Sequence, residues 1–324
     1  MTPEPFAVSS GLDRTLVRIA VVIPTFKRPE HLAKTLASVS DQQTGRCFAV
    51  VVVENHAGAC EGATVASAML AQGRVRGLCV IESRQGNCNA YNRGFAEALE
   101  AFPNLTHVAI IDDDEIAVPV WLETLARAAA TGADIVGGPQ RPVFDDAAGA
   151  RRFAAHPVFR SAHQTSGSTN LITSTGNCLI GVNVLRAMGP PYLDERFNFL
   201  GGGDTDFFTR CRDRGFTFQW AEEAAVIETV PARRTERRWI TARSLRNGLI
   251  SAIIQRKHNP GLAGRIKVII KSLALLVASP FRSLLLWRQT GSLYAGSYHM
   301  MIAMGRLLAE FGYTIEQYRQ PEKN

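Results

Sequence analysis

At 324 residues the chain can bury one large α/β domain with an extension, or two small domains. Its 46% hydrophobic and 20% charged content is typical of a folded protein. Six cysteines without a CxxC pair argue against a disulfide framework or a zinc site and favour a reducing compartment. Residues 1–14 lack a basic region followed by an apolar one, so we expect no signal peptide.

The net charge of +7 is unevenly distributed along the chain. From residue 231 onward there are sixteen Lys/Arg and four Asp/Glu, whereas the first 230 residues hold twenty Lys/Arg and twenty-five Asp/Glu. We therefore predict two parts, residues 1–230 and residues 231–324, of which the second meets an anionic surface. Nucleic acid is the competing partner for a basic segment, but no recognised nucleic-acid module is present, so we predict no nucleic-acid partner.

Short apolar runs alternate with helical patterns along the first 140 residues. Buried strands are predicted at residues 17–24, 48–53, 77–81, 108–111 and 134–138. Helices are predicted from residue 29, at 61–71, around 95–102 and at 119–130. This alternation predicts an α/β fold with a mostly parallel central sheet and helices on both faces. Neither GxGxxG after the first strand nor GxxxxGK[ST] is present, which disfavours a dinucleotide-binding domain and a P-loop enzyme.

Four consecutive carboxylates, Asp112 to Glu115, follow the strand predicted at residues 108–111. Such a cluster is destabilised by self-repulsion, which a hard cation relieves. By composition alone, a solvated acidic turn is an equally good interpretation. The position favours a site, because the carboxyl end of a central parallel strand faces the crevice in which open α/β sheets bind ligands.

The helical pattern is lost from residue 141 to residue 169, which we predict to be a long loop. A short strand follows at residues 178–180, and a glycine run at 201–203 leads directly into Asp204. An Asp near a helix start is favoured by the unpaired N–H groups and the helix dipole, so a helix cap is the simplest interpretation of Asp204. A functional carboxylate is the alternative.

Six segments, taken together and in chain order, resemble glycosyltransferase family 2, a large inverting family with the GT-A fold. They are VVIPTFKRP, VVVEN, the segment from Arg84 to Gly94, IIDDDE, TGN at residues 175–177, and GGGDTDFFTR. The resemblance covers residues 17–230. It implies a Rossmann-like GT-A domain that acts on nucleotide-sugars, followed here by a C-terminal helical extension.

The resemblance also implies a role for each residue that matches a family motif. Asp204 would be the general base, and Asp114 would be the ligand of a Mn²⁺ or Mg²⁺ ion in the DxD pattern. The donor would be bound by Pro24, Thr25, Arg28, Glu54, Arg84, Asn92, Asp112 and Asp113. Residues in the vicinity of the acceptor or the phosphates would be Asn177, Gly202, Gly203, Arg234 and Arg238.

The sequence departs from the family pattern at several positions. Glu54 stands where the family usually has Asp, Tyr91 where it commonly has Arg, and Gly203 where it usually has Glu. Arg238-Trp239 keeps the Arg-Trp of the QxxRW motif of processive members without its Gln, so we infer that one sugar is added at a time. The missing Glu keeps an alternative open, a catalytically degenerate member that acts as a membrane-associated scaffold.

The residue types suit sugar transfer. Breaking a sugar–diphosphate bond leaves negative charge on the diphosphate, which a divalent cation held by one or two carboxylates neutralises. Inversion requires the acceptor hydroxyl to approach opposite the leaving group, where a carboxylate takes its proton. We predict a UDP-, dTDP- or GDP-linked donor, and an acceptor that is a lipid-linked glycan or part of a surface polysaccharide.

The basic part of the chain is also apolar. Residues 266–287 are interrupted by charges, and their longest uncharged run, 272–281, has ten residues, against the about twenty that a membrane-spanning helix needs. We predict helices here and at residues 294–311 that lie on the inner leaflet of the membrane, which makes the protein cytoplasmic and peripheral. The alternative is that these helices pack on the catalytic part or join two subunits in a homo-oligomer.

Overall fold

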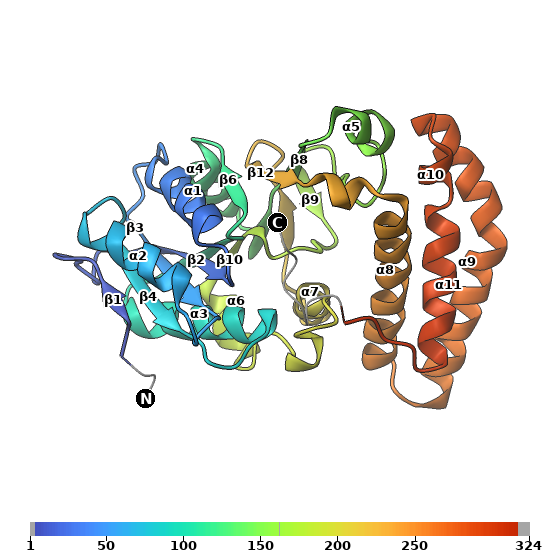
Figure 1. The fold of residues 1–324 in the computed structure, drawn as a ribbon. Coiled ribbons are helices and arrows are strands. Elements are labelled where there is room, and N and C mark those ends of the chain that lie inside the picture. Colours follow the sequence, from blue (N-terminus) through green and yellow to red (C-terminus); the bar gives the residue numbers. More distant parts are fainter. Residues whose placement is uncertain (1–3, 162, 317–324) are drawn as a thin grey trace.

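The computed structural model describes residues 4–161 and 163–316. Figure 1 shows an α/β part and, beside it, a unit of long helices. In chain order, the strands are β1 (Ala7–Val8), β2 (Ile19–Thr25), β3 (Phe48–Glu54), β4 (Gly77–Ile81), β5 (His107–Ile111), β6 (Glu115–Ala117), β7 (Ile135–Gly137), β8 (Gln140–Phe144), β9 (Gly167–Thr169), β10 (Asn177–Gly181), β11 (Phe218–Trp220) and β12 (Val226–Val230). The helices are α1 (Pro29–Ser40), α2 (Glu61–Ala71), α3 (Asn87–Ala101), α4 (Trp121–Ala129), α5 (Ala147–Phe153), α6 (Val182–Met188), η1 (Glu195–Phe197), α7 (Gly203–Asp213), η2 (Ala232–Thr235), α8 (Arg237–His258), α9 (Gly261–Thr290), α10 (Leu293–Gly296) and α11 (Tyr298–Glu310).

The larger sheet has its topological switch point at β2 and β5. Its strand order is β1-β4-β3-β2-β5-β10-β7-β11-β9. β2 lies between β3 and β5 and is parallel to both, so the chain leaves β2 along one side of the sheet and returns on the other. Ligands bind at such points, outside the carboxyl ends of the strands. The mostly parallel sheet is confirmed, although the antiparallel β10 separates β5 from β7, which the sequence did not predict.

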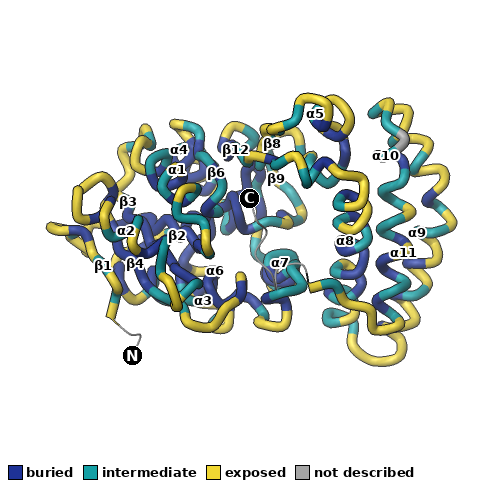
Figure 2. The backbone as a smooth tube through the Cα atoms, in the orientation of Figure 1, coloured by how far each residue is buried: buried dark blue, intermediate teal, exposed yellow. Residues whose placement is uncertain are grey.

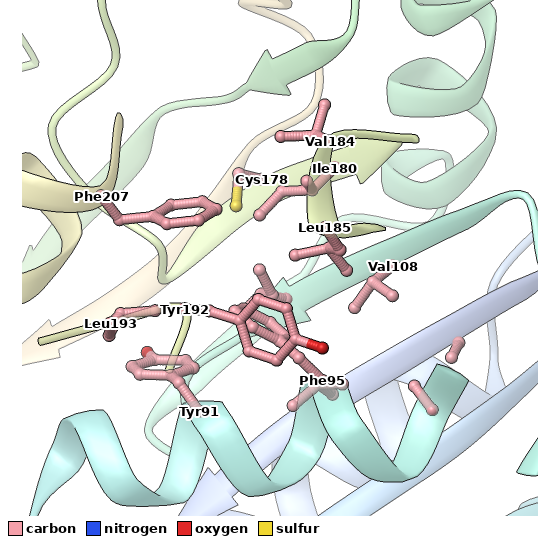
Figure 3. Close-up of a cluster of buried hydrophobic side chains, with 14 of the residues drawn as sticks. Tyr91, Phe95, Val108, Cys178, Ile180, Val184, Leu185, Tyr192, Leu193 and Phe207 are labelled. Carbon is pink, nitrogen blue, oxygen red and sulfur yellow. The ribbon is translucent and has the colours of Figure 1, made fainter. Parts of the chain in front are cut away.

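Helices cover both faces of this sheet, because its strands are apolar on both. Along β2, Ala20 and Val22 belong to one core cluster, whereas Val21 and Ile23 belong to the other. Successive side chains of a strand point to opposite faces, so each cluster lies on its own side. Figure 3 shows the first cluster, where Phe95 of α3 packs with side chains of β10, α6 and α7. The second cluster joins α1, α2 and α4, and Figure 2 shows the buried strands between the more exposed helices.

The prediction of a long loop at residues 141–169 is wrong. This stretch holds most of β8, then α5 and β9. β8 pairs with β12, which also pairs with β6, and the three strands form a second sheet. β8 lies at an edge and alternates between exposed and half-buried residues, which explains its weak apolar signal. Asp146 begins α5, because its carboxylate accepts the N–H groups of Ala148 (2.9 Å) and Gly149 (2.7 Å).

The helical unit contains α8 to α11, and α11 packs against both α8 and α9 (Figure 1). Two glycines permit the close approach of α8 and α11. A Cβ at Gly248 would lie 2.2 Å from the carbonyl oxygen of Ile302, and a Cβ at Gly305 would lie 2.0 Å from that of Leu245. Any larger residue at either position would push the two helices apart.

The predicted helices of the basic part are confirmed as α9 and as α10 with α11. Of the helices in residues 4–161 and 163–316, α9 has the length and composition of a membrane-crossing segment. A longest uncharged run of ten residues therefore does not exclude that α9 crosses a membrane. Most of α9 is not buried against the rest of the chain.

Ion pairs join α8 to α7 in the α/β part. Asp206 of α7 is fully buried, and its carboxylate lies 2.7 Å from Nζ of Lys257 and 3.3 Å from Nε2 of His258. Lys257 also contacts Asp194, at 2.8 Å. These contacts attach the far end of α8 to the helix whose first turn carries the predicted base.

Candidate active site

A cavity of about 370 Å³, called the first cavity here, opens at the switch point of the sheet. Pro24 and Thr25 from the end of β2 line it, together with Asp112, Asp113 and Asp114 from the residues after β5. Asp113 is only 6% exposed, so the acidic cluster is not a solvated turn. With Arg28, which also lines the cavity, six of the predicted donor and metal residues therefore meet at one site.

The segment after β4 forms another wall of the first cavity, through residues 85–87. Asn55, which directly follows β3, holds this segment in place. Its Nδ2 donates to the carbonyl oxygens of Glu82 (3.0 Å) and Arg84 (2.9 Å), and its Oδ1 accepts the N–H of Gly86 (2.8 Å). Asn55 also lines the cavity itself, so it both shapes the wall and presents a polar group.

Arg28, the residue before α1, is the nearest cation to the acidic cluster. Its Nη1 lies 2.6 Å from Oδ2 of Asp114 and 3.3 Å from Oδ1 of Asp113. The hydroxyl of Thr25 donates to the other oxygen of Asp113, at 2.8 Å. Arg28 and Thr25 thus hold the cluster together and partly offset its charge.

One further carboxylate, Glu228, lies beside Glu115, the last member of the cluster. Glu115 of β6 and Glu228 of β12 are directly opposite each other in the second sheet, an arrangement that like charges disfavour. Glu228 pairs with Arg234, at 2.5 Å between Oε1 and Nη1. The side-chain amide of Gln140 donates to Glu115. Burial, and then the charge of Asp112, raises the pKa of Glu115 well above its ordinary value.

The cluster itself is short of positive charge. Burial, followed by the nearby charge of Asp114, raises the pKa of both Asp112 and Asp113 to about 7. The hydroxyl of Tyr91 donates to Asp112 and Arg28 acts on Asp113, but neither restores an ordinary pKa. A group of buried carboxylates with raised pKa values is one that a bound cation would stabilise.

Asp204 enters the first cavity from a separate element, the first turn of α7. Its Oδ1 accepts the N–H of Thr205, at 2.7 Å. The cap position belongs to Gly202, so Asp204 satisfies a free N–H of the helix without being its N-cap. Burial raises the pKa of Asp204, and the Thr205 N–H and Arg243 offset this only in part. The carboxylate therefore combines a local structural contact with a place in the cavity.

The space for the Glu that the family usually has before this Asp is filled. A Cβ on Gly203 would lie 2.6 Å from Sγ of Cys88 and 3.4 Å from Cβ of Phe197. Gly202 has a positive φ of 89°, and a Cβ there would lie 2.3 Å from Cγ2 of Ile250 in α8. Packing from α3 therefore leaves no room for a side chain at position 203. The absence of a side chain at Gly202 lets α8 approach α7.

The sequence model of the family described as "Glycosyltransferase like family 2" matches residues 17–247. The chain belongs to this family. The predicted family, and with it the class of enzyme, a glycosyltransferase, is thereby confirmed. The match extends into α8, so it includes residues beyond the predicted boundary at residue 230.

Two curated relatives are similar to parts of this family member. The succinoglycan biosynthesis protein ExoM of Rhizobium meliloti is 34% identical over 147 residues, which are 44% of this chain and 45% of ExoM. Glycosyltransferase AglE of Haloferax volcanii is 26% identical over 223 residues, 68% of each chain. The match to ExoM therefore spans less than half of that protein.

Solved structures show the same fold. S. aureus TarS 1-349 in complex with UDP aligns with a TM-score of 0.55 over 91% of this chain and 90% of that chain, at 14% identity. The mannosyltransferase PcManGT from Pyrobaculum calidifontis, in complex with GDP-Man and Mn²⁺, aligns with a TM-score of 0.55 over 94% and 90%, at 17% identity. At these identities the likeness concerns the fold, and the GT-A prediction is confirmed.

The first cavity is not lined by Glu54, Arg84 or Arg238, which the resemblance placed at the donor or the phosphates. Glu54 is fully buried, and its carboxylate accepts the N–H groups of His56 (2.8 Å) and Ala63 (3.0 Å) near the start of α2. Arg84 and Arg238 lie on the surface, with 60% and 89% of their side chains exposed, in ion pairs with glutamates. The structure thus gives Glu54 a structural partner, where the resemblance implied the nucleotide.

Two predicted asparagines connect parts of the scaffold. The side-chain amide of Asn92 donates to the carbonyl oxygen of Leu193 and accepts its N–H, both at 2.8 Å. Asn177 accepts the indole N–H of Trp121, at 2.7 Å. Asn177 and Gly202 line a second cavity next to the first, which is described below.

The sequence interpretation missed several residues of the first cavity. Phe159 and Trp239 stack with their ring planes 9° apart and their centroids 6.0 Å apart, and both line the cavity. Gln140 and Arg243 line it as well, and Arg234 also lines it, so the start of the basic part reaches this cavity. Trp239 was visible in the Arg-Trp pair, but its partner came from the stretch predicted to be a loop.

The donor atoms present fit a hard divalent cation. In residues 4–161 and 163–316, no group of three or more His, Cys, Asp or Glu side chains is arranged to hold a metal by itself. A cation here would take one or two carboxylate oxygens from the cluster and complete its coordination with phosphate and water oxygens. Oxygen donors of this kind suit Mg²⁺ and Mn²⁺, and the carboxylates with raised pKa values show where positive charge is lacking.

Proposed function

We propose that this protein transfers one sugar at a time from a nucleotide-sugar to an acceptor hydroxyl, with inversion at the sugar carbon and with a divalent cation. The observation that supports this most is that one cavity contains both the Asp112–Asp114 cluster and Asp204. The two sets of carboxylates come from different elements. One set suits the cation and the diphosphate, and the other suits the acceptor proton.

The donor would lie along the carboxyl ends of β2 and β3. Pro24, Asn55 and residues 85–87 offer a polar and apolar wall for a nucleoside. Arg28 and Arg234, which line the same cavity, would neutralise part of the diphosphate charge. The complexes of TarS with UDP and of PcManGT with GDP-Man support a UDP-, dTDP- or GDP-linked sugar as the donor class.

Asp114 is the proposed ligand of Mn²⁺ or Mg²⁺, with Asp112 and Asp113 beside it. When bound, the cation would supply positive charge that stabilises the negative charge developing on the leaving diphosphate. Tyr91 orients Asp112 through its hydroxyl, and Thr25 and Arg28 orient Asp113. The residues around the cluster thus fix the direction of its oxygens before the donor arrives.

Asp204 is the proposed general base. A carboxylate within hydrogen-bond reach of the acceptor hydroxyl takes its proton as the oxygen attacks the sugar carbon. Burial raises the pKa of Asp204 towards the working pH. A general base is most effective when its pKa lies near that pH, because it is then still ionised and accepts a proton readily. Cys88 occupies the space that a side chain at position 203 would need, so the Glu usual in the family does not fit there. Asp204 still faces the cavity.

Residues 1–230 form the catalytic part in this proposal, and residues 231–324 the membrane-associating part that also completes the site. α9 contains no acidic residue, and its exposed apolar side chains recur every three or four positions and so share a face. They are Leu262, Ile266, Ile270, Leu273, Val277, Phe281, Leu284, Leu285 and Trp287. Basic residues on the same helix would face anionic lipid head groups of the inner leaflet.

The acceptor would then be a lipid-linked glycan or a surface polysaccharide under assembly on the cytoplasmic face. The name of ExoM, a succinoglycan biosynthesis protein, supports polysaccharide assembly as the setting. Homo-oligomer formation through the exposed face of α9 is the competing role for that face. Flotation with vesicles that contain anionic lipid, compared with the sedimentation behaviour of the protein alone, separates the two roles.

The melting temperature, measured over a panel of nucleotide-sugars with and without Mn²⁺ or Mg²⁺, tests the proposed function. Binding to the folded state at a hundredfold excess over the dissociation constant stabilises by about 2.7 kcal/mol. We expect one class of nucleotide-sugar to raise the melting temperature in a cation-dependent way, and Asp114→Ala to remove the cation dependence. If no nucleotide-sugar shifts the melting temperature, the degenerate scaffold is the better account.

A further inference from the structure

A second cavity, of about 750 Å³, adjoins the first at Asp204. Asp204, Gln140, Phe159 and Arg243 line both cavities. One side of the second cavity belongs to the α/β part, including α7, and the other belongs to α8 with Lys271 of α9. In Figure 1, α7 and α8 face each other at this place. A molecule in the second cavity therefore reaches the carboxylate that we propose as the base.

The wall of the second cavity is strongly basic. Its cationic side chains are Arg160, Arg212, Arg243, Arg246 and Lys271. The acidic residues of the same wall are Asp204 and Glu228, and Glu228 is already paired with Arg234 at 2.5 Å. Among the cations, Arg212 pairs with the half-exposed Asp213 at 2.7 Å, which leaves the wall with more positive than negative charge. Arg246 is only 3% exposed, so its charge is largely screened from bulk solvent by protein. This surplus of positive charge in a concave wall attracts anions.

A buried arginine behind this wall strengthens its positive field. Arg306 of α11 is 6% exposed and donates to Ser251 (2.7 Å), Gln255 (2.6 Å) and Ser272 (3.1 Å), which are all neutral. Ser251 and Gln255 are themselves part of the cavity wall. Glu310, the carboxylate closest in effect to Arg306, already contacts two other arginines. The side chains that accept hydrogen bonds from Arg306 are neutral and do not offset its charge, so its positive potential extends to the cavity wall.

The chemistry of the wall favours phosphate oxygens. A guanidinium presents a planar fork of N–H donors that binds phosphate or carboxylate oxygens in pairs. A lone carboxylate carries a single negative charge, fewer than the cations that surround this cavity. A phosphate or diphosphate group carries more charge and more acceptor oxygens, and so matches the wall better.

We propose that the second cavity binds the acceptor through a phosphate or diphosphate group, which Arg212, Arg246 and Lys271 contact while the acceptor hydroxyl reaches Asp204. This inference rests on the proposed function, because it assigns the acceptor side of the same site. Lys271 connects the cavity to α9, whose exposed apolar face includes Ile270 and Leu273 on the same helical turn. A phosphate bound there can belong to a lipid carrier whose chain follows α9, or to a phosphorylated glycan.

Hydrogen–deuterium exchange of the full chain, in EDTA and 0.1 M salt, tests the binding with inorganic diphosphate and with farnesyl diphosphate. We expect both probes to slow exchange in α8, and a tighter binding of farnesyl diphosphate if the natural phosphate is on a lipid carrier. Equal binding of the two probes would assign it to a phosphorylated glycan. Slowed exchange only at the ends of β2 and β5 would overturn the inference, because it places the anion in the first cavity.

Lys271→Ser and Lys267→Ser form a matched pair for this test. Both lysines are exposed on α9, four residues apart, and Lys267 does not line the second cavity. We expect Lys271→Ser to weaken the binding of inorganic diphosphate about threefold to tenfold, as the loss of a partly exposed charged contact does, and Lys267→Ser to leave it unchanged. Equal effects of the two substitutions would show non-specific attraction to a basic helix and overturn the proposed site.

The two proposals fail separately. Protection of the ends of β2 and β5 by a nucleotide-sugar with Mn²⁺ tests the donor site, whereas protection of α8 by diphosphate in EDTA tests the acceptor site. A protein that shows the first and not the second remains a transferase with a different acceptor.

Discussion

Asp206→Asn removes the charge that attaches α8 to α7, and the structure predicts a large loss of stability from it. The carboxylate of Asp206 is fully buried, with Lys257 Nζ and Arg210 Nε at 2.7 and 3.0 Å from one oxygen and His258 at 3.3 Å from the other. An asparagine keeps the shape of the side chain. It leaves the two cations without the negative charge that they now share.

The magnitude follows from the burial of each partner. Removing one member of a buried ion pair costs roughly 3–5 kcal/mol, whereas exposed pairs contribute about 0–1 kcal/mol. Lys257 and Arg210 are 24% and 25% exposed, and Lys257 keeps a second partner, Asp194, at 2.8 Å. We therefore expect a loss of about 2–4 kcal/mol in the free energy of unfolding, between the buried and the exposed cases.

Equilibrium unfolding in urea at pH 7 measures this loss. Asp213→Asn is the matched control, because Asp213 contacts the same His258 but is 46% exposed on its side chain. We expect a loss below about 1 kcal/mol for the control. Equal losses of unfolding free energy for the two variants would refute this explanation of how α8 is attached to α7, since they would mean that burial of Asp206 adds nothing to its interactions.

Three further predictions concern the site and its surroundings. Arg28→Ala should strengthen the binding of Mn²⁺ to the donor-free protein, because the guanidinium, 2.6 Å from Asp114, competes with the cation for that carboxylate. The same substitution should weaken the binding of the nucleotide-sugar. Calorimetry measures both affinities, and an unchanged affinity for Mn²⁺ would contradict the competition. Gly203→Glu should cost about 1–3 kcal/mol by overpacking against Cys88, and Cys88→Gly in the same chain should recover part of it in urea unfolding. Burial lowers the pKa of His156 to about 4, so its contribution to stability is complete above pH 6.5 and is lost as the pH falls towards 4. We expect wild type to lose up to about 3 kcal/mol more than His156→Gln between pH 7 and pH 4, and parallel losses would refute this assignment.

The sequence predicted the parts of the fold and site that depend on local pattern. The apolar strands end at polar residues, and the carboxyl ends of parallel strands share one edge of a sheet, which was enough to bring Thr25 and Asp112 together. The order of β10 between β5 and β7 has no local signal, because pairing between distant strands is decided by tertiary packing. Glu54 shows the same limit, since its partners are the N–H groups of His56, in the loop after β3, and of Ala63, in the first turn of α2.

The missed residues of the site have a similar cause. Phe159 and Trp239 stack on each other in the cavity wall although 80 positions separate them along the chain, so neither residue predicts the other. Glu228 gained its place from the register of β12 against β6, which no pattern of side chains in either strand specifies. The edge strand β8 was overlooked because its alternation is of half-buried and exposed residues, with few apolar ones.

The central claim is that Asp204 takes the acceptor proton beside a cation held by the Asp112–Asp114 cluster. Hydrolysis of the nucleotide-sugar that raises the melting temperature, measured with Mn²⁺ for wild type and Asp204→Asn, tests it most directly. The account predicts a rate lower by about 10²- to 10⁴-fold in the variant, with the affinity for the donor retained. A variant that hydrolyses the donor as fast as wild type would contradict the assignment of the base, and with it the proposed mechanism.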